Sequence, residues 1–335
     1  MITALLALHL AHAATRPRYG GTLRVEVRAS IETPDPPTAG HGLPDLASTF
    51  NIARWEAGRR AVYDANENAP GGRPFVDAVD IQMGKSLRDQ SIDLELGHAD
   101  IVELGPAELL RQAPGRRVWT SSPVRVIALV FSPRIADEHL REALAWAVDR
   151  PAIHSLMQRQ GEVSAALLPQ WISGYAFVFP TASDPARART LLAALPPAQR
   201  TLTLGADDAA LRTIAERIAL NARYVGLQIA VVPQAASAEV RLVEVRVGSA
   251  DPAKALAGLA SAFGLPEPAR AESMETLAAA ERALLQDFRA IPLVHLPDVY
   301  GVGPRVKGGP GITPLGEWRF ENLWLSDSRP EGGKP

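Results

Sequence analysis

Cysteine is absent from the 335 residues of the chain. This absence excludes disulfide bonds, thiolate zinc sites, iron–sulfur clusters, cysteine nucleophiles and lipid attachment through an N-terminal cysteine. An excess of positive charge is also lacking, because 35 lysine and arginine residues face 37 aspartate and glutamate residues, for a formal net charge of −2. Proteins whose main task is to grip nucleic acid need a strong basic excess, so we expect no nucleic-acid partner.

Long apolar runs are also missing, and no segment after the amino terminus approaches the roughly 18 consecutive apolar residues of a membrane helix. Residues 1–14 read MITALLALHLAHAA, a short apolar run that ends in Ala11-His12-Ala13, an A-x-A-like cleavage site. The pattern predicts a signal peptide over 1–14, and a buried first strand or a misassigned start is the alternative. A cleaved leader implies a soluble periplasmic protein, secreted and not lipid-anchored.

Catalytic and metal-binding signatures are the next absence. The histidines beyond the leader are His41, His98, His139, His154 and His295, and no two have the spacing of a helical zinc pair. No G-x-S-x-G nucleophile elbow or phosphate-binding glycine loop occurs either. His295 lies in an apolar strand and is expected to be a packed core or cleft residue. We therefore expect a binding protein rather than an enzyme, with no metal and no cofactor.

What the chain does have is an ordinary globular composition, with 47% hydrophobic and 21% charged residues, and a length that suggests two or three domains. Strand patterns alternate with helical ones, which indicates the α/β class. Thr22–Arg28 alternates like a half-buried strand, and Val124–Phe131 is apolar enough for a strand covered on both faces. The helix predicted over Asp208–Val225, between two short strands and ended by Gly226, indicates a parallel βαβ unit.

The carboxyl-terminal third continues this pattern. A strand is predicted over Glu239–Val247, a long helix over Ser273–Ala290 and a strand over Ile291–Leu296. Gly301–Leu315 is rich in glycine and proline and is predicted to be a loop. The tail over residues 326–335 is polar and is expected to be flexible.

Five stretches, in order along the chain, resemble one known family. They are Tyr19–Val25 (YGGTLRV), Trp55–Asp77, Gly97–Ile101 (GHADI), Leu140–Arg150 (LREALAWAVDR) and Ala290–Gly308. The most specific of them is Leu140–Arg150. Together they resemble the extracellular solute-binding proteins of family 5, the peptide/nickel receptors of ABC importers, here in a shortened form.

The chain departs from the family pattern in ways that bear on function. Typical members insert a small accessory domain after the first strand, where this chain has only the short stretch Pro37–Ala47, expected to be a surface connection. Peptide-binding members carry an aspartate that pairs with the peptide's amino group, and Gly248 stands at that place. Arg246 lies nearby, and a cation there favours a ligand carboxylate or phosphate. In the alternative alignment, shifted by one or two residues, Arg246 is a solvated strand residue.

The resemblance implies a two-lobe, type II-like periplasmic-binding-protein fold, with mixed sheets, flanking helices, a central cleft and a hinge. Lobe I is expected to be discontinuous, over residues 15–130 and 297–325, and lobe II to span residues 131–296. The two chain crossings that form the hinge are expected near residues 131–133 and 296–297.

The implied function is that of an extracytoplasmic solute-binding protein of an ABC importer. It would bind a peptide-like or other small solute between the lobes and deliver it, as a monomer, to the permease membrane subunits. The alternative is a degenerate member that acts as a non-transport ligand sensor or scaffold. Five residues are the cleft candidates, each of which could also be a core residue: Trp55, Trp171, Tyr175, Arg246 and Tyr300. Trp171 and Tyr175 are favoured because they lie in Pro169–Pro180, an aromatic loop broken by glycine and proline.

Overall fold

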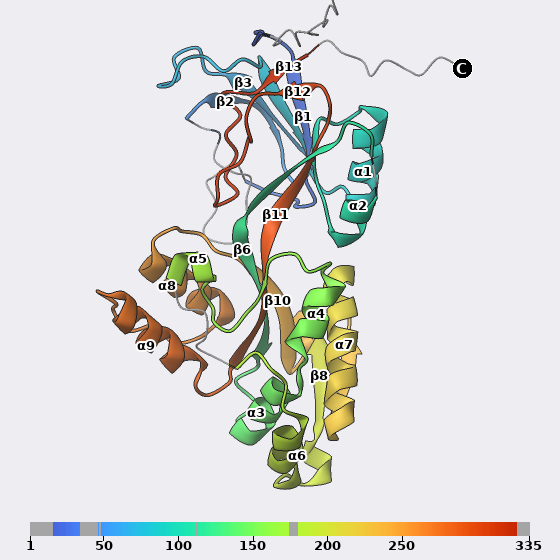
Figure 1. The fold of residues 1–335 in the computed structure, drawn as a ribbon, viewed down its shortest axis with the longest axis vertical. Coiled ribbons are helices and arrows are strands. Elements are labelled where there is room, and N and C mark those ends of the chain that lie inside the picture. The colour runs from blue at the N-terminus through green and yellow to red at the C-terminus, as the bar shows by residue number, and fades with distance from the viewer. Residues whose placement is uncertain (1–15, 34–45, 47, 112, 174–179, 327–335) are drawn as a thin grey trace, which may run out of the picture.

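The computed structural model describes residues 16–33, 46, 48–111, 113–173 and 180–326. The molecule is elongated, with β1 to β4 at one end and α3 and α6 at the other (Figure 1). The described strands are β1 (Thr22–Glu26), β2 (Phe50–Glu56), β3 (Arg60–Ala65), β4 (Ala78–Gln82), β5 (Ile101–Glu103), β6 (Arg117–Phe131), β7 (Glu162–Val163), β8 (Thr201–Gly205), β9 (Gln228–Val232), β10 (Val240–Arg246), β11 (Ala290–Val302), β12 (Val306–Lys307) and β13 (Trp324–Leu325).

Helices flank the sheet on both sides (Figure 1). Those of the described residues are α1 (Leu87–Leu96), α2 (Pro106–Leu110), α3 (Glu138–Ala147), α4 (Arg150–Leu156), α5 (Gln170–Ser173), α6 (Pro185–Ala193), α7 (Ala209–Val225), α8 (Pro252–Phe263) and α9 (Met274–Leu285), with short 3₁₀ helices η1 (Pro197–Gln199) and η2 (Ala235–Ser237). None of the helices within the described ranges combines the length and the apolar character needed to cross a bilayer.

One mixed sheet of eleven strands runs through the molecule, in the order β2-β3-β4-β1-β5-β11-β6-β10-β8-β9, with β7 paired to β11. β1 is parallel to β4 and β5, whereas β11 is antiparallel to both β5 and β6. β10 is antiparallel to β6 and parallel to β8, which is parallel to β9. The α/β class predicted from the sequence is confirmed, and β6 and β11 are neighbouring long strands in the interior of the sheet.

The βαβ unit predicted around α7 is confirmed. Asp208 is the N-cap of the helix, where its side chain accepts hydrogen bonds from the amides of Ala210 and Leu211. Gly226 ends the helix in the left-handed conformation, at φ 94°, which glycine adopts without steric cost. The flanking strands β8 and β9 are parallel and paired in register from Thr201 to Gly205.

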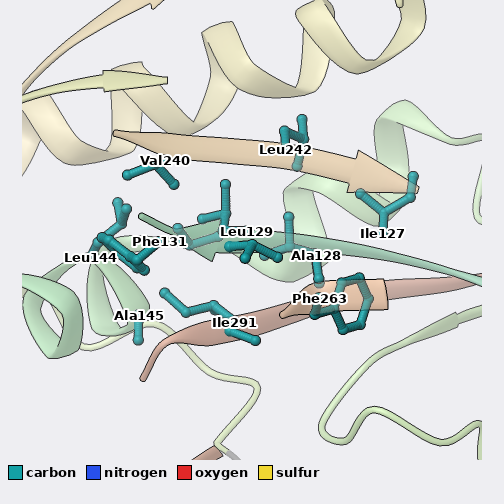
Figure 2. Close-up of a cluster of buried hydrophobic side chains, with 14 of the residues drawn as sticks. Ile127, Ala128, Leu129, Phe131, Leu144, Ala145, Val240, Leu242, Phe263 and Ile291 are labelled. Atoms are coloured by element: carbon teal, nitrogen blue, oxygen red, sulfur yellow. The ribbon is translucent and has the colours of Figure 1, made fainter. Parts of the chain in front are cut away.

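Two large hydrophobic cores occupy the two ends of the sheet. The first core includes Leu23, Ile81, Ile101, Trp318 and Phe320. The second core includes Ile127, Leu129, Leu144, Leu242 and Phe263, which Figure 2 shows packed between strands and helices. A smaller cluster is formed by Leu94, Ala99, Val102, Leu104 and Val299. More than one core is what the apolar content predicted.

Both central strands pass from one core to the other. Along β6, Trp119 packs in the first core and Val126 in the second. Along β11, Leu296 packs in the second core and Tyr300 in the first. Residues 126–130, assigned to lobe I from the sequence, pack in the second core because the apolar run of β6 continues into its helices. The change of core therefore falls between Trp119 and Val126 on β6 and between Leu296 and Tyr300 on β11, and the expected lobe boundaries and hinge stay predictions.

The carboxyl-terminal elements differ in length from their predictions. The strand predicted over residues 291–296 runs on to Val302, because Pro292 and Pro297 sit at register shifts, where a strand tolerates proline. The helix predicted over residues 273–290 ends at Leu285. Phe288 has a positive φ of 57°, a conformation that no helix continues through.

Three expectations fall on residues outside the description. These are the leader over residues 1–14, the tail beyond Ser326, and all of Pro37–Ala47 except Leu46. Leu46 is buried and packs in the first core beside Phe50. The surface connection predicted over residues 37–47 stays a prediction.

Candidate ligand-binding site

The carboxyl ends of two sets of parallel strands meet at the middle of the molecule. The first set, β1, β4 and β5, runs from the first core toward the middle. The second set, β8, β9 and β10, runs from the second core toward the middle. The two sets point toward each other because β5, β11, β6 and β10 are each antiparallel to the next. α1 and α2 begin there from the first side, at Ser86 and Gly105, and α7 and α8 from the second, at Asp208 and Asp251. Ligands of open α/β sheets bind at such carboxyl ends, and helix N-termini favour negative charge.

Pro123 of β6 and Pro297 of β11 are direct register partners where the strands pass between the cores. Neither proline has an N–H to donate, and the register shifts on both sides of Pro297. The Pro123 carbonyl accepts a 2.7 Å hydrogen bond from Trp171 Nε1, and the Pro297 carbonyl accepts one of 2.7 Å from Arg125 Nη2. The backbone ladder is therefore interrupted at this pair, which we call the crossing.

Charged side chains surround the crossing. Arg246 of β10 forms an ion pair with Asp298 of β11, and its Nη2 donates a 2.5 Å hydrogen bond to the Leu315 carbonyl. On the other side of the same carboxylate, Arg125 Nε lies 3.1 Å from Asp298 Oδ1, and Arg125 Nη1 lies 2.9 Å from Glu244 Oε1. Two guanidinium groups and two carboxylates thus form one network, which we call the crossing cluster (Arg125, Glu244, Arg246 and Asp298).

Arg125 of the crossing cluster is held in its charged form. Burial by itself lowers the pKa of Arg125, but the carboxylates of Glu244 and Asp298 outweigh this effect and raise the pKa above its ordinary value. Asp298 is 8% exposed, and its backbone N–H donates to Ser121 Oγ at 2.8 Å. A carboxylate buried to this extent requires its cationic partners, so the cluster is one structural unit.

A loop of the first lobe lies directly over this cluster. Besides the bond from Arg246 to Leu315, the Ser122 amide donates to the Pro314 carbonyl at 2.9 Å. A Cβ placed on Gly316 would lie 2.4 Å from Asp298 Oδ2 and 2.6 Å from Arg246 Nη2. Only glycine allows the loop to approach so closely in this left-handed conformation. Arg246 therefore joins the end of β10 to the loop that contains Leu315.

A second contact joins the two ends on the side of α1 and α7. Arg28, just after β1, places Nη1 2.9 Å from Oδ2 of Asp208 at the start of α7. The Arg28 backbone N–H donates to Oε2 of Glu103 at 2.5 Å. Burial raises the pKa of Glu103, and the hydrogen bonds from Arg28 and Gln90 only partly offset this rise. The Arg28–Asp208 pair is partly exposed on both sides and is worth little as a stabilising contact.

Two of the five cleft candidates lie at the crossing. Trp171 of α5 is 39% exposed, and its indole is fixed by the bond to Pro123. Arg246 belongs to the crossing cluster. Neither position by itself tests whether a ligand binds there, so both stay predictions. The alternative for Arg246 was a solvated strand residue. Its side chain instead forms an ion pair with Asp298.

The other three candidates are placed differently. Tyr300 is buried in the first core with its ring edge-on to Trp318, and burial, then Asp298 and Glu103, raise the pKa of its hydroxyl. Trp55 lies on the edge strand β2, where its Nε1 donates to the Glu32 carbonyl at 3.1 Å. Tyr175 lies outside the described residues.

The sequence analysis missed Arg125, Glu244 and Asp298. A signal was present, since Arg125 is the only charged residue in the apolar run Val124–Phe131, and Asp298 follows the apolar stretch that precedes it. A charge within a buried strand requires a partner of opposite sign. The partner of Arg125 or of Asp298 depends on the register between their strands, and the sequence around either residue does not specify that register.

A buried polar network lies beneath α5. His295 is buried, as expected, with Nδ1 3.2 Å from Glu162 Oε1 and Nε2 3.2 Å from Ser164 Oγ. From α9, Oε1 of the buried Glu281 accepts a 2.7 Å hydrogen bond from the Leu168 amide. Burial raises the pKa of Glu281 to about 7. His295 and Glu281 thus fix the segment that leads into α5 and Trp171.

A cavity of about 1140 Å³ lies at the far end of the first core. Its walls come from the residues before β1, the end of α1 and the segment after β11, and they include Tyr19, Leu96, Asp100, Arg116 and Arg305. None of the five cleft candidates lines this cavity, which is a place apart from the crossing where a small molecule could fit.

The fold and the crossing define a two-lobed binding protein, and comparison with known families agrees. The model of the bacterial extracellular solute-binding proteins, family 5 (middle region), matches residues 38–261. The chain belongs to this family, which is one of solute-binding proteins and not of enzymes. A search of curated proteins found no match.

Solved structures of the same family share the fold. The ABC transporter substrate-binding protein CtaP from Listeria monocytogenes superimposes with a TM-score of 0.65 at 15% identity, over 83% of this chain and 66% of that one. DppA from Helicobacter pylori, in complex with the peptide STSA, gives 0.68 at 16% identity over 83% and 62%. NikA from Staphylococcus aureus, in complex with Ni(L-His)2, gives 0.67 at 14% identity over 83% and 67%.

These comparisons confirm the family resemblance and the periplasmic-binding-protein fold predicted from the sequence. The identities are low enough that the likeness to these structures shows the fold alone. The chain spans about two thirds of the length of the relatives that it matches. The shortened form expected from the sequence agrees with this coverage.

Proposed function

We propose that the protein is the extracytoplasmic solute-binding component of an ABC importer. It would bind a peptide-like or other small solute between its two lobes, at the crossing, and deliver it to the permease membrane subunits. The observation that carries this proposal is the convergence of two sets of strand ends and helix N-termini on an interrupted pair of strands. The relatives named above were solved with a peptide and with a nickel–histidine complex, so the family fixes the class and not the solute.

The proposed mechanism is a hinge motion without covalent chemistry. The proline pair Pro123 and Pro297 offers the place to bend, because the ladder is weakest there. A ligand that contacts both lobes binds the closed form more tightly than the open one and shifts the population toward closure. The permease then recognises the closed, loaded form. Trp171 would supply an aromatic face at the crossing, since its indole N–H is already satisfied by Pro123.

Arg246 would receive an acidic group of the solute. A guanidinium has five N–H donors, and Asp298 and Leu315 engage Nη1 and Nη2 of this one. Donors remain for a ligand carboxylate or phosphate that approaches from the exposed side of the side chain. Such a group would compete with Asp298, which in turn would keep Arg125 as its partner.

We place the working protein in the periplasm, as a monomer. A second candidate function is that of a ligand sensor or scaffold that no longer transports. It is favoured by the coverage of only about two thirds of the relatives' length and by Gly248 in place of the amine-pairing aspartate. Loss of uptake of the bound solute on deletion of the gene supports import, whereas unchanged uptake supports sensing.

A thermal-shift screen tests the proposal. The purified protein is heated with short peptides, opines and metal–histidine chelates in separate wells. A solute present at about a hundred times its Kd stabilises the folded form by about 2.7 kcal/mol, which raises Tm by several degrees. A folded protein whose Tm moves with no member of any class would contradict the proposal.

A further inference from the structure

Negative charge is absent from two stretches of the second lobe. Residues 185–206 and 217–238 contain neither aspartate nor glutamate. The same stretches contain five arginines, which are Arg187, Arg189, Arg200, Arg217 and Arg223. A chain with a net charge of −2 therefore carries a local excess of positive charge in this part of its sequence.

The fold gathers these stretches at one end of the molecule. They contain α6, η1 and β8, and then the second half of α7 and β9. α6 lies at the end opposite β1 to β4, beside the carboxyl-terminal part of α7 (Figure 1). Arg189 of α6 stacks on the ring of Tyr224 of α7 at 4.6 Å and donates a 3.3 Å hydrogen bond to its carbonyl. The end is distant from the crossing and from the cavity of the first lobe.

Most of this charge is uncompensated. Arg187 pairs with Glu142 at 2.5 Å and is neutralised. Among the described residues no carboxylate pairs with the other four, which we call the arginine tip (Arg189, Arg200, Arg217 and Arg223). Because a guanidinium is charged at any physiological pH, the tip presents a permanent positive potential.

Apolar side chains stand exposed beside the tip. Tyr224 is 70% exposed and Leu220 is 54% exposed. They are four residues apart on α7, so they lie on the same helix face, which Arg217 shares three residues before Leu220. Arginines beside a tyrosine and a leucine on a helix surface are the composition that lies at a membrane interface, with the rings and chains at the level of the headgroups.

We propose that the arginine tip, with Leu220 and Tyr224, docks on an anionic lipid bilayer. The inference goes beyond solute binding and does not rest on it. Nucleic acid is the less favoured polyanion, because the protein as a whole carries a slight negative charge. In addition, the phosphate backbone of a duplex offers no apolar surface for the exposed Leu220 to contact. The exposed area is small and carries few charges, so the docking is weak and reversible. It would hold the protein close to an anionic membrane surface.

Vesicle sedimentation tests the docking. The protein is mixed with vesicles of phosphatidylglycerol and phosphatidylcholine, or of phosphatidylcholine alone. We expect binding to the anionic vesicles only, and its loss when salt is raised from about 0.1 M to about 0.5 M, since screening shortens the reach of the charges. Each arginine near an anionic surface contributes about fivefold to the partition constant, so R189Q/R223Q is expected to bind about thirtyfold more weakly. Tyr224→Ser tests the apolar contribution and is expected to weaken binding to the anionic vesicles at about 0.1 M salt.

The matched control is R88Q/R270Q, which removes two exposed arginines elsewhere on the molecule and changes the net charge equally. This control is expected to bind like the unaltered protein. Equal loss in both double variants would overturn the proposal, because the effect would then be one of total charge. Equal binding to vesicles of phosphatidylcholine alone would also overturn it, and so would a stronger affinity for duplex DNA than for the anionic vesicles. Circular dichroism confirms that each variant is folded.

Discussion

Pro123 and Pro297 lie opposite each other where β6 and β11 pass between the two hydrophobic cores, and the carbonyl of each is bonded to a side chain. Of those two side chains, Trp171 is also a proposed ligand contact, and Arg125 shares the carboxylate of Asp298 with Arg246, the other proposed contact. The interrupted point of the strand pair and the proposed ligand contacts are therefore directly connected. A ligand that engages Trp171 would act directly on the hinge.

This arrangement predicts uneven protection along the two central strands. The amides of residues 121, 122, 124, 125, 296 and 298, which flank the two prolines, are expected to exchange with solvent at least about tenfold faster than those of residues 127–130, where the ladder is regular and buried. Hydrogen exchange followed by NMR or fragmentation mass spectrometry measures this within a single molecule. Uniform protection along β6 would mean that the crossing is not a point of bending.

The crossing cluster predicts that loss of its buried carboxylate lowers stability far more than loss of an exposed one. Asp298→Asn leaves Arg125 and Arg246 without their shared carboxylate, and we expect it to lower the free energy of unfolding by about 3 kcal/mol. Asp64→Asn, at an exposed position of β3, is the matched control and is expected to change stability by less than about 0.5 kcal/mol. Urea unfolding measures both. A small loss in Asp298→Asn, comparable to the control, would show that the arginines find other partners.

Glu281 predicts a pH dependence of stability. Its pKa is about 7 in the folded protein and near 4.5 when the chain is unfolded, so the folded form holds a proton that the unfolded form has released. The stabilisation from this group is complete below about pH 4.5 and is lost as pH rises through about 7, by roughly 3 kcal/mol in total. The groups that face Glu281 are the amides of Leu167 and Leu168, and His295 also contacts the Leu167 carbonyl.

Glu281→Gln removes this titration, and Glu267→Gln, an exposed position after α8, is its control. Urea unfolding between about pH 5 and pH 8 is expected to show a stability difference between wild type and Glu281→Gln that declines as pH rises. The control is expected to run parallel to wild type throughout. A difference that is constant with pH would mean that Glu281 stays ionised over this range.

The sequence predicted those parts of the fold that local patterns determine. β1, α7 and the strands around it were recognisable because alternation, an N-cap and a terminal glycine are all local signals. β11 was predicted too short, because its prolines lie at register shifts that only the paired strand reveals. Family motifs identified the class of protein without any knowledge of the pairing.

The candidate site was only partly predictable. Trp171 and Arg246 were chosen from loop composition and from the family pattern, and the structure brings both to the crossing. Arg125 and Asp298 are far apart in the sequence and meet only through the register of β6 with β11. Their pairing is a property of the tertiary fold, so no local pattern could assign it.

We propose that a solute binds at the crossing and not in the cavity beside the first core. Isothermal titration with the solute found by the thermal-shift screen tests it in two single variants. Trp171→Ala removes the aromatic face at the crossing, and Tyr19→Ala removes an exposed ring from the wall of the cavity. We predict that Trp171→Ala weakens binding about tenfold or more while Tyr19→Ala leaves Kd unchanged. Loss of affinity in Tyr19→Ala with full affinity in Trp171→Ala would contradict the claim and place the solute in the cavity.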